Sequence, residues 1–129
     1  MAEMNTRRAR IVVGTMLVTF VVTRVLLTLS PNSDFDVAGY NIHHLFTGLL
    51  LISAGGIPLA LFAGQSRLLD IACVLFGAGL ALALDEWVYL IATDGSNASY
   101  LLPVSFRGGV LMVALAAAYV VVLRFASRR

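Results

Sequence analysis

The stretch LLDIACVLFGAGLALALDEWVYLI, residues 68–91, decides the fold, because no residue between Asp70 and Asp85 is charged. An apolar helix of about 20 residues is long enough to cross a hydrocarbon core of about 30 Å. The stretch therefore predicts a membrane-spanning helix that carries Asp85 and Glu86 near one end. Cys73 has no second cysteine to pair with, so we expect a small core residue there and no disulfide or CxxC site.

Three more apolar runs predict spanning helices over about 9–29, 41–63 and 102–125. Ser30-Pro31 ends the first, because proline disfavours helix in the residue before it. Of the 129 residues, 60% are hydrophobic and 12% are charged, whereas soluble domains are about a quarter charged. The sequence thus predicts an all-α polytopic membrane protein with four transmembrane helices in an antiparallel bundle, forming a single domain over residues 1–129.

The charges predict the orientation of this bundle. Seven arginines fall on one side of a four-span topology, namely Arg7, Arg8, Arg10, Arg67, Arg124, Arg128 and Arg129, whereas Asp34, Asp36 and Asp94 fall on the other. Since basic residues are enriched in cytoplasmic loops, we expect both termini in the cytoplasm. The formal net charge of +2 is too small to indicate a nucleic-acid partner, and membrane lipids are the expected surroundings.

Arg24 and Arg107 do not follow this rule, because they lie near the opposite ends of their predicted helices. They lie there at the level of other polar residues. At 1.5 Å per residue, Asp85 and Glu86 lie about 25 Å from the inner end of their helix, and Arg24 lies about 21 Å from Arg10. The predicted polar layer comprises Arg24, His43, His44, Asp85, Glu86 and Arg107. Because a charge inside a membrane is costly, such side chains normally face the bundle interior and pair. We expect Arg24 or Arg107 to contact Asp85 or Glu86.

Three interpretations of this layer remain open. The first is a structural network of ion pairs. The second is a divalent metal site formed by His43, His44, Asp85 and Glu86, since imidazole and carboxylate are common metal ligands, although adjacent residues on a helix point about 100° apart. The third is a pocket for an anion or lipid headgroup, in which arginines hold a phosphate or carboxylate. The expected role is structural or ligand-binding, and the alternative is a membrane enzyme acting on a lipid or small polar substrate, with or without a metal.

Small residues recur on three of the predicted helices. They comprise Gly48, Gly55, Gly56, Gly77, Gly79, Gly108, Gly109 and the alanine-rich run 114–118. Small residues allow membrane helices to approach closely. These faces predict packing within the bundle, and they would also suit a second copy of the chain or another membrane protein.

Two motifs carry a resemblance. The run 41–48, NIHHLFTG, opens the second span, and the run 76–86, FGAGLALALDE, closes the third. With His43, His44, Gly48, Asp85 and Glu86 in these places, the chain resembles a group of small uncharacterised bacterial integral membrane proteins. The resemblance covers helices two and three and implies a bacterial inner membrane. Members of that group continue with a Tyr-Trp pair and a Ser-Val-Asp stretch, where this chain has 99–101, SYL, and 104–107, VSFR.

Overall fold

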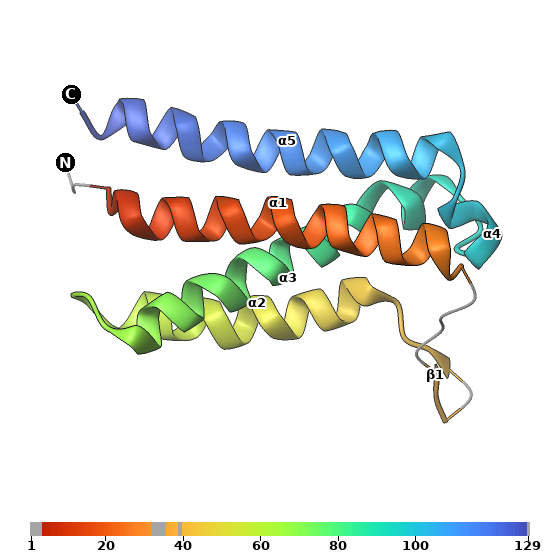
Figure 1. The fold of residues 1–129 in the computed structure, drawn as a ribbon, viewed down its shortest axis with the longest axis horizontal. Helices are drawn as coiled ribbons and strands as arrows, with labels where there is room; N and C mark the ends of the chain where they lie inside the picture. The colour runs from red at the N-terminus through yellow and green to blue at the C-terminus, as the bar shows by residue number, and fades with distance from the viewer. Residues whose placement is uncertain (1–3, 32–35, 39, 129) are drawn as a thin grey trace.

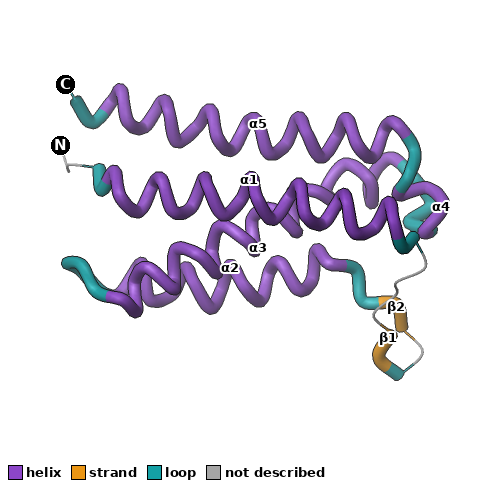
Figure 2. The backbone as a smooth tube through the Cα atoms, viewed as in Figure 1, coloured by secondary structure: helices purple, strands orange, loops and turns teal. Residues whose placement is uncertain are grey.

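The computed structural model describes residues 4–31, 36–38 and 40–128. This part of the chain forms five helices, which are α1 (Thr6–Leu29), α2 (His44–Leu61), α3 (Arg67–Ala92), the short α4 (Asn97–Tyr100) and α5 (Pro103–Ala126) (Figure 1). Two strands of two residues each, β1 (Asp36–Val37) and β2 (Tyr40–Asn41), form a small antiparallel hairpin between α1 and α2 (Figure 2). Asp34 and Arg129, which entered the charge argument, lie outside the described residues.

The four long helices correspond to the four predicted spans. Each is long and apolar enough to cross a membrane by length and composition. The longest, α3, has 26 residues, which corresponds to about 39 Å at 1.5 Å per residue. The all-helical class and the number of long apolar helices are therefore confirmed.

The helix ends differ from the predicted bounds where capping groups intervene. Helix α1 begins at Thr6 instead of residue 9, because the side chain of Asn5 accepts a hydrogen bond from the backbone N–H of Arg8. Helix α4 forms between the third and fourth predicted spans, because Ser96 caps it through the N–H of Ser99. Helix α2 begins at His44 instead of residue 41, because a side chain of α3 that is described with the site below caps it there.

Helix α3 is the central element of the fold. It packs against α1, α2 and α5, whereas α1 and α2 make few contacts with each other. In its most apolar stretch 44% of the residues are buried inside the protein, against 17% for α1 and 11% each for α2 and α5. Figure 1 shows α3 running obliquely from the α2 side of the bundle to the α5 side and passing behind α1. The side chains of Met16, Phe20, Ala81 and Val113 form a core cluster where α1, α3 and α5 meet.

Glycines bring the backbones of α2 and α3 into contact. A Cβ atom added to Gly79 would lie 2.6 Å from the carbonyl oxygen of Gly48, and one added to Gly55 would lie 2.4 Å from the carbonyl oxygen of Ala72. On the α1 side of α3, a Cβ on Gly77 would lie 2.5 Å from the carbonyl oxygen of Val12. The small residues predicted for packing thus serve contacts within this chain, since backbones at such distances leave no room for a side chain.

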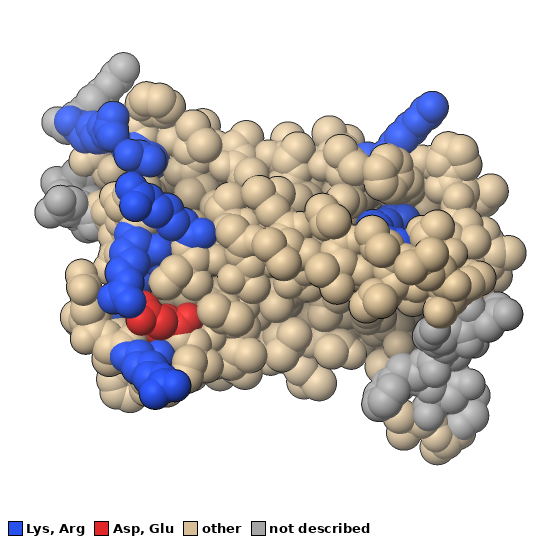
Figure 3. All heavy atoms as spheres, in the orientation of Figure 1, with Lys and Arg blue, Asp and Glu red and all other residues tan. Residues whose placement is uncertain are grey.

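The two ends of the molecule differ in character. Both termini lie at one end (Figure 1), where basic side chains gather (Figure 3). We call this the basic end, defined by Arg7, Arg8, Arg10, Arg67, Arg124 and Arg128. There Arg7 of α1 forms an ion pair of 2.7 Å with Asp70 of α3, in the first turn of that helix. We call the opposite end, which carries His43, His44, Asp85 and Glu86, the histidine end.

Candidate functional site

A buried ion pair joins α1 to α3 at the histidine end. Both Nε and Nη2 of Arg24 lie 2.6 Å from Oδ1 of Asp85. Asp85 is fully buried and Arg24 is 9% exposed. Nη2 of Arg24 also donates to the backbone carbonyl of Ser105 at 3.0 Å and to its hydroxyl at 3.2 Å. The predicted contact between a base and an acid of the polar layer is therefore confirmed for Arg24 and Asp85.

Glycines on α5 make room for this pair. A Cβ atom on Gly109 would lie 2.6 Å from Oδ1 of Asp85 and 3.0 Å from Nη2 of Arg24. A Cβ on the preceding Gly108 would lie 2.4 Å from the Cβ of Val88. Any larger residue at position 109 would have to displace one of the paired charges, so α5 closes over the ion pair only because glycine stands there.

The second carboxylate oxygen of Asp85 connects the pair to α2 and α4. Oδ2 accepts a short hydrogen bond from the hydroxyl of Tyr100 and lies 3.0 Å from Nε2 of His44. The Tyr100 ring in turn covers Arg24, whose Cζ lies 4.2 Å from the ring centroid. Burial raises the pKa of Tyr100 well above its usual value, and the charge of Asp85 raises it further, so the phenol stays protonated and donates.

Glu86 caps the start of α2 from the neighbouring helix. Its Oε2 accepts the backbone N–H of Leu45 at 2.7 Å, whereas the N-cap residue His43 makes no capping bond with its own side chain. The first N–H groups of a helix need partners, and the positive helix end favours a carboxylate. Helix α2 therefore begins beside Glu86, at His44, and not at residue 41.

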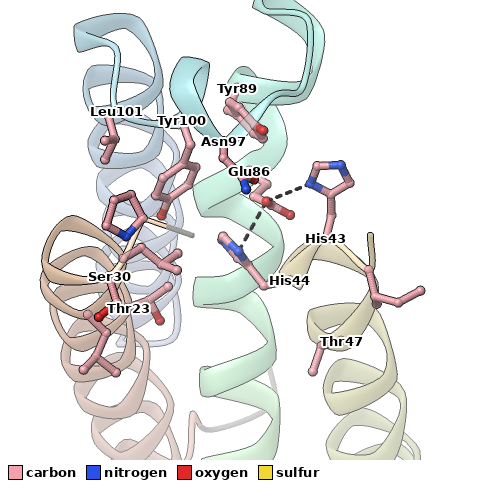
Figure 4. Close-up of a pocket in the computed structure, with 14 residues that line it drawn as sticks. Thr23, Ser30, His43, His44, Thr47, Glu86, Tyr89, Asn97, Tyr100 and Leu101 are labelled. Carbon is pink, nitrogen blue, oxygen red and sulfur yellow. Dashed lines mark hydrogen bonds and ion pairs between the residues drawn. The ribbon is translucent and has the colours of Figure 1, made fainter. Parts of the chain in front are cut away.

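Both histidines contact the other carboxylate oxygen of Glu86, Oε1. Nδ1 of His43 lies 3.2 Å from Oε1 and Nδ1 of His44 lies 3.3 Å from the same atom (Figure 4). His43 and His44 are adjacent in sequence, yet both reach Glu86, because His43 precedes the first turn of α2 and is not bound by helical spacing. The 100° separation that applies within a helix does not apply to this doublet.

The network has a negative formal charge. Carboxylates only accept hydrogen bonds, so Nε2 of His44 donates to Asp85. Counted with neutral histidines, Arg24 contributes +1 and Asp85 and Glu86 contribute −2, which leaves −1.

Arg107 does not join the polar layer. Its side chain is exposed one turn into α5, and no ion pair found among the described residues includes it. The equal count of two bases and two acids suggested by the sequence therefore does not describe the site. The reason is geometric, since Ser105 and Gly109 are the α5 residues that face Arg24 and Asp85.

The described residues do not form a metal centre. Within them, no group of three or more His, Cys, Asp or Glu side chains is arranged to hold a metal ion. The ring nitrogens of His43 and His44 lie at hydrogen-bond distance from the oxygens of Asp85 and Glu86 instead of around a common point. Metal binding by these four residues stays a prediction from the sequence, and a hydrogen-bonded network is the arrangement that the structure shows.

A cavity of about 420 Å³ lies beside this network, between the ends of α1 and α2 (Figure 4). Its polar lining residues are Thr23, Ser30, His43, His44, Thr47, Glu86, Tyr89, Asn97 and Tyr100, and its apolar lining residues are Leu26, Leu27, Pro31, Ile42 and Leu101. Arg24 is not part of the lining. The anion-pocket interpretation required arginines to face the ligand, and the structure commits Arg24 to Asp85 and Ser105.

Three residues of the site were not singled out from the sequence. They are Tyr89 and Tyr100, which are 1% and 7% exposed, and Ser105, which is fully buried. Tyr89 lies four residues after Asp85, on the same face of α3, which is a signal that sequence spacing offers. Tyr100 and Ser105 reach Asp85 and Arg24 only through the turn that follows α3, and no local pattern marks them.

The turn that positions Tyr100 is held by Asp94. Its Oδ1 accepts the N–H of Ser96 at 3.0 Å, the hydroxyl of Ser96 at 2.8 Å and the hydroxyl of Ser99. These hydrogen bonds, led by that from Ser99, lower the pKa of Asp94 to about 2. A depressed pKa means that this contribution to stability is complete above about pH 4 and is lost as the pH falls through about 2.

Comparison with models of known protein families, with curated proteins and with solved structures finds no match to this chain. The resemblance to small bacterial membrane proteins therefore stays a prediction. Any functional conclusion rests on the geometry of the histidine end.

Proposed function

We propose that this protein is a membrane-embedded binding protein, which takes up the polar end of an amphipathic molecule at the histidine end. The chain would cross the bilayer as an antiparallel bundle of four helices, as its four long apolar helices suggest. A ligand would enter from the lipid, between α1 and α2.

The cavity carries this proposal. It combines polar lining residues, among them histidines, tyrosines and Glu86, with leucines, between the ends of α1 and α2. Ligand sites are typically concave and about 300–1,000 Å³, with a few polar groups among apolar ones. A lining of both kinds matches a molecule that is itself polar at one end and apolar at the other.

Photocrosslinking tests this function. A lipid analogue with a diazirine near its headgroup should label peptides that contain residues of the cavity wall when the protein is reconstituted in bilayers. Leu27→Trp, which places a large ring in the cavity, should abolish this labelling. Val121→Trp, on an exposed part of α5, is the matched control and should leave it unchanged. Equal labelling of the two variants would contradict the proposal.

A membrane enzyme is the second candidate, and one contact favours it. Nδ1 of His43 lies 3.2 Å from Glu86, and His43 lines the cavity. A carboxylate that holds one ring nitrogen of a histidine orients the other as a proton acceptor, an arrangement used in general base catalysis. His43→Gln would abolish turnover of a bound substrate and would leave its binding in place.

We further propose that the basic end faces the cytoplasm of a bacterial cell and that the protein lies in the inner membrane. The gathering of arginines at the end where both termini lie supports this orientation (Figure 3). A fluorescent reporter fused after residue 129 should fluoresce, and a phosphatase fused there should be inactive. The opposite pattern would reverse the orientation and place the histidine end at the cytoplasmic side.

A further inference from the structure

We infer that the histidine-end cavity binds the ammonium group of a cationic amphiphile, which Glu86 and the surrounding aromatic rings hold. This inference rests on the proposed binding function and names the chemical class of the ligand.

The charges of the lining favour a cation over an anion. Among the described residues that line the cavity, Glu86 is the acid, and no arginine or lysine is present. The N-terminus of α2 would attract an anion, but Glu86 already occupies it through the N–H of Leu45. With both histidines neutral, the network carries the net charge of −1 derived above. The carboxylate of Glu86 would repel a phosphate or carboxylate ligand, whereas an ammonium group would compensate its negative charge.

Aromatic rings form a continuous chain among the lining residues. The ring of His43 lies 6.0 Å from that of Tyr89, Tyr89 lies 5.3 Å from Tyr100, and Tyr100 lies 5.6 Å from His44. Tyr89 and Tyr100 pack edge to face, at 87°. Tyrosine rings attract a nearby quaternary ammonium group, because their faces are electron-rich.

The chain itself places one cation against this set of rings. Cζ of Arg24 lies 4.2 Å from the centroid of Tyr100, outside the cavity lining. Its charge is compensated by Asp85 at 2.6 Å, so it does not repel a second cation in the cavity. Tyr89, His43 and His44 are the other rings of the cavity lining.

The remaining lining suits a hydrocarbon tail. Leu26, Leu27, Ile42 and Leu101 are apolar residues of the lining. Leu26 is 59% exposed and Leu101 is 48% exposed, so the apolar part of the lining continues onto the outer surface of the helices. A tail that leaves the cavity there would lie along α1 in the lipid, and this continuity favours an amphiphile over a small free amine.

Titration of the full-length protein in neutral-detergent micelles tests the inference. The probes are decyltrimethylammonium, decanol and decyl sulfate, which share a tail and differ in headgroup, and tetramethylammonium, which lacks the tail. Calorimetry gives the affinity, and ring signals of labelled tyrosines and histidines report whether the cavity is the site. We expect saturable binding of decyltrimethylammonium with shifted Tyr89 and His43 signals, and about tenfold weaker binding of decanol and decyl sulfate.

Variants identify the groups that hold the cation. Glu86→Gln should weaken binding of decyltrimethylammonium about tenfold, whereas Asp70→Asn, at the basic end, should leave it unchanged. Because Glu86 also caps α2, a ring variant provides a second measure. Tyr89→Leu removes the ring and should bind several-fold more weakly, whereas Tyr119→Leu, on an exposed part of α5, should bind as the wild type does.

The possible failures are distinguishable. Equal affinity for decyltrimethylammonium, decanol and decyl sulfate, with shifts at the cavity, would overturn the ammonium assignment and leave the amphiphile-binding function standing. Binding of tetramethylammonium as tight as that of the decyl compound would overturn the amphiphile in favour of a free amine. Absence of any shift at the cavity with all four probes would overturn both the inference and the proposed function.

Discussion

The two ends of the molecule use the same pair of residue types between the same two helices. At the basic end Arg7 of α1 meets Asp70 of α3 at 2.7 Å, with side chains 57% and 30% exposed. At the histidine end Arg24 of α1 meets Asp85 of α3 at 2.6 Å, with side chains 10% and 0% exposed. The two ion pairs have nearly the same N–O distance, and they differ in how deeply their side chains are buried.

Burial changes what each pair can do. An exposed pair is screened by solvent and salt, and either partner can be hydrated when the other is removed. A buried pair must satisfy all its polar atoms inside the protein, and Asp85 accordingly contacts Arg24, His44 and Tyr100. The buried pair is thus the centre of a network that borders a cavity, whereas the exposed pair links two helix ends.

The largest expected effect comes from removing the buried acid. Asp85→Asn leaves the charge of Arg24 uncompensated and should lower the free energy of unfolding by about 3–5 kcal/mol. Reversible unfolding in mixed micelles measures the change. A loss below about 1 kcal/mol would mean that Arg24 finds another partner or reaches water, and the contrast between the ends would fail.

An intermediate effect should follow from the residue that closes over the pair. Gly109→Ala places a methyl group 2.6 Å from Oδ1 of Asp85, and overpacking of this kind costs about 1–3 kcal/mol. The same unfolding measurement applies. Gly14→Ala is the matched control, because a Cβ there meets no atom within 4 Å, and it should leave stability unchanged or raise it slightly. Equal effects at the two positions would show that α5 does not close tightly over the pair.

The smallest expected effect belongs to the exposed pair. Asp70→Asn should lower the free energy of unfolding by about 0–1 kcal/mol, and high salt should reduce even this difference. Comparison with Asp85→Asn under identical conditions gives the contrast directly. A cost at position 70 as large as that at position 85 would show that burial is not what distinguishes the two ends.

Local sequence was sufficient for the long helices because each carries its own signal. Four apolar runs, Pro31 after α1 and the arginines at the helix ends are all readable in short windows. The pairing of a base with an acid of the polar layer followed from the cost of burying a charge, which holds wherever the residues lie. Glycine-rich stretches also predicted close packing from local sequence alone. Because glycine has no side chain, it lets the backbone of any neighbouring helix approach closely.

Other features needed contacts between distant segments. The start of α2 depended on Glu86, which is 41 residues from Leu45, and a local rule for helix starts does not include a carboxylate on another helix. Depth along a helix suggested that Arg107 joins the site, but depth does not fix the direction of a side chain around the helix axis. Tyr100 and Ser105 entered the site through the turn after α3, which carried no pattern of its own.

The sequence by itself determined that this chain forms four apolar helices with charges near both ends, because hydropathy and charge are sums over neighbouring residues. Only the tertiary structure decided which charges are buried, which are exposed and where a cavity opens. Those outcomes depend on the rotation of each helix and on the glycines that set the spacing of α2, α3 and α5. Rotation and spacing follow from packing between segments far apart in the sequence, and the same residues at a different rotation would leave Arg24 without Asp85.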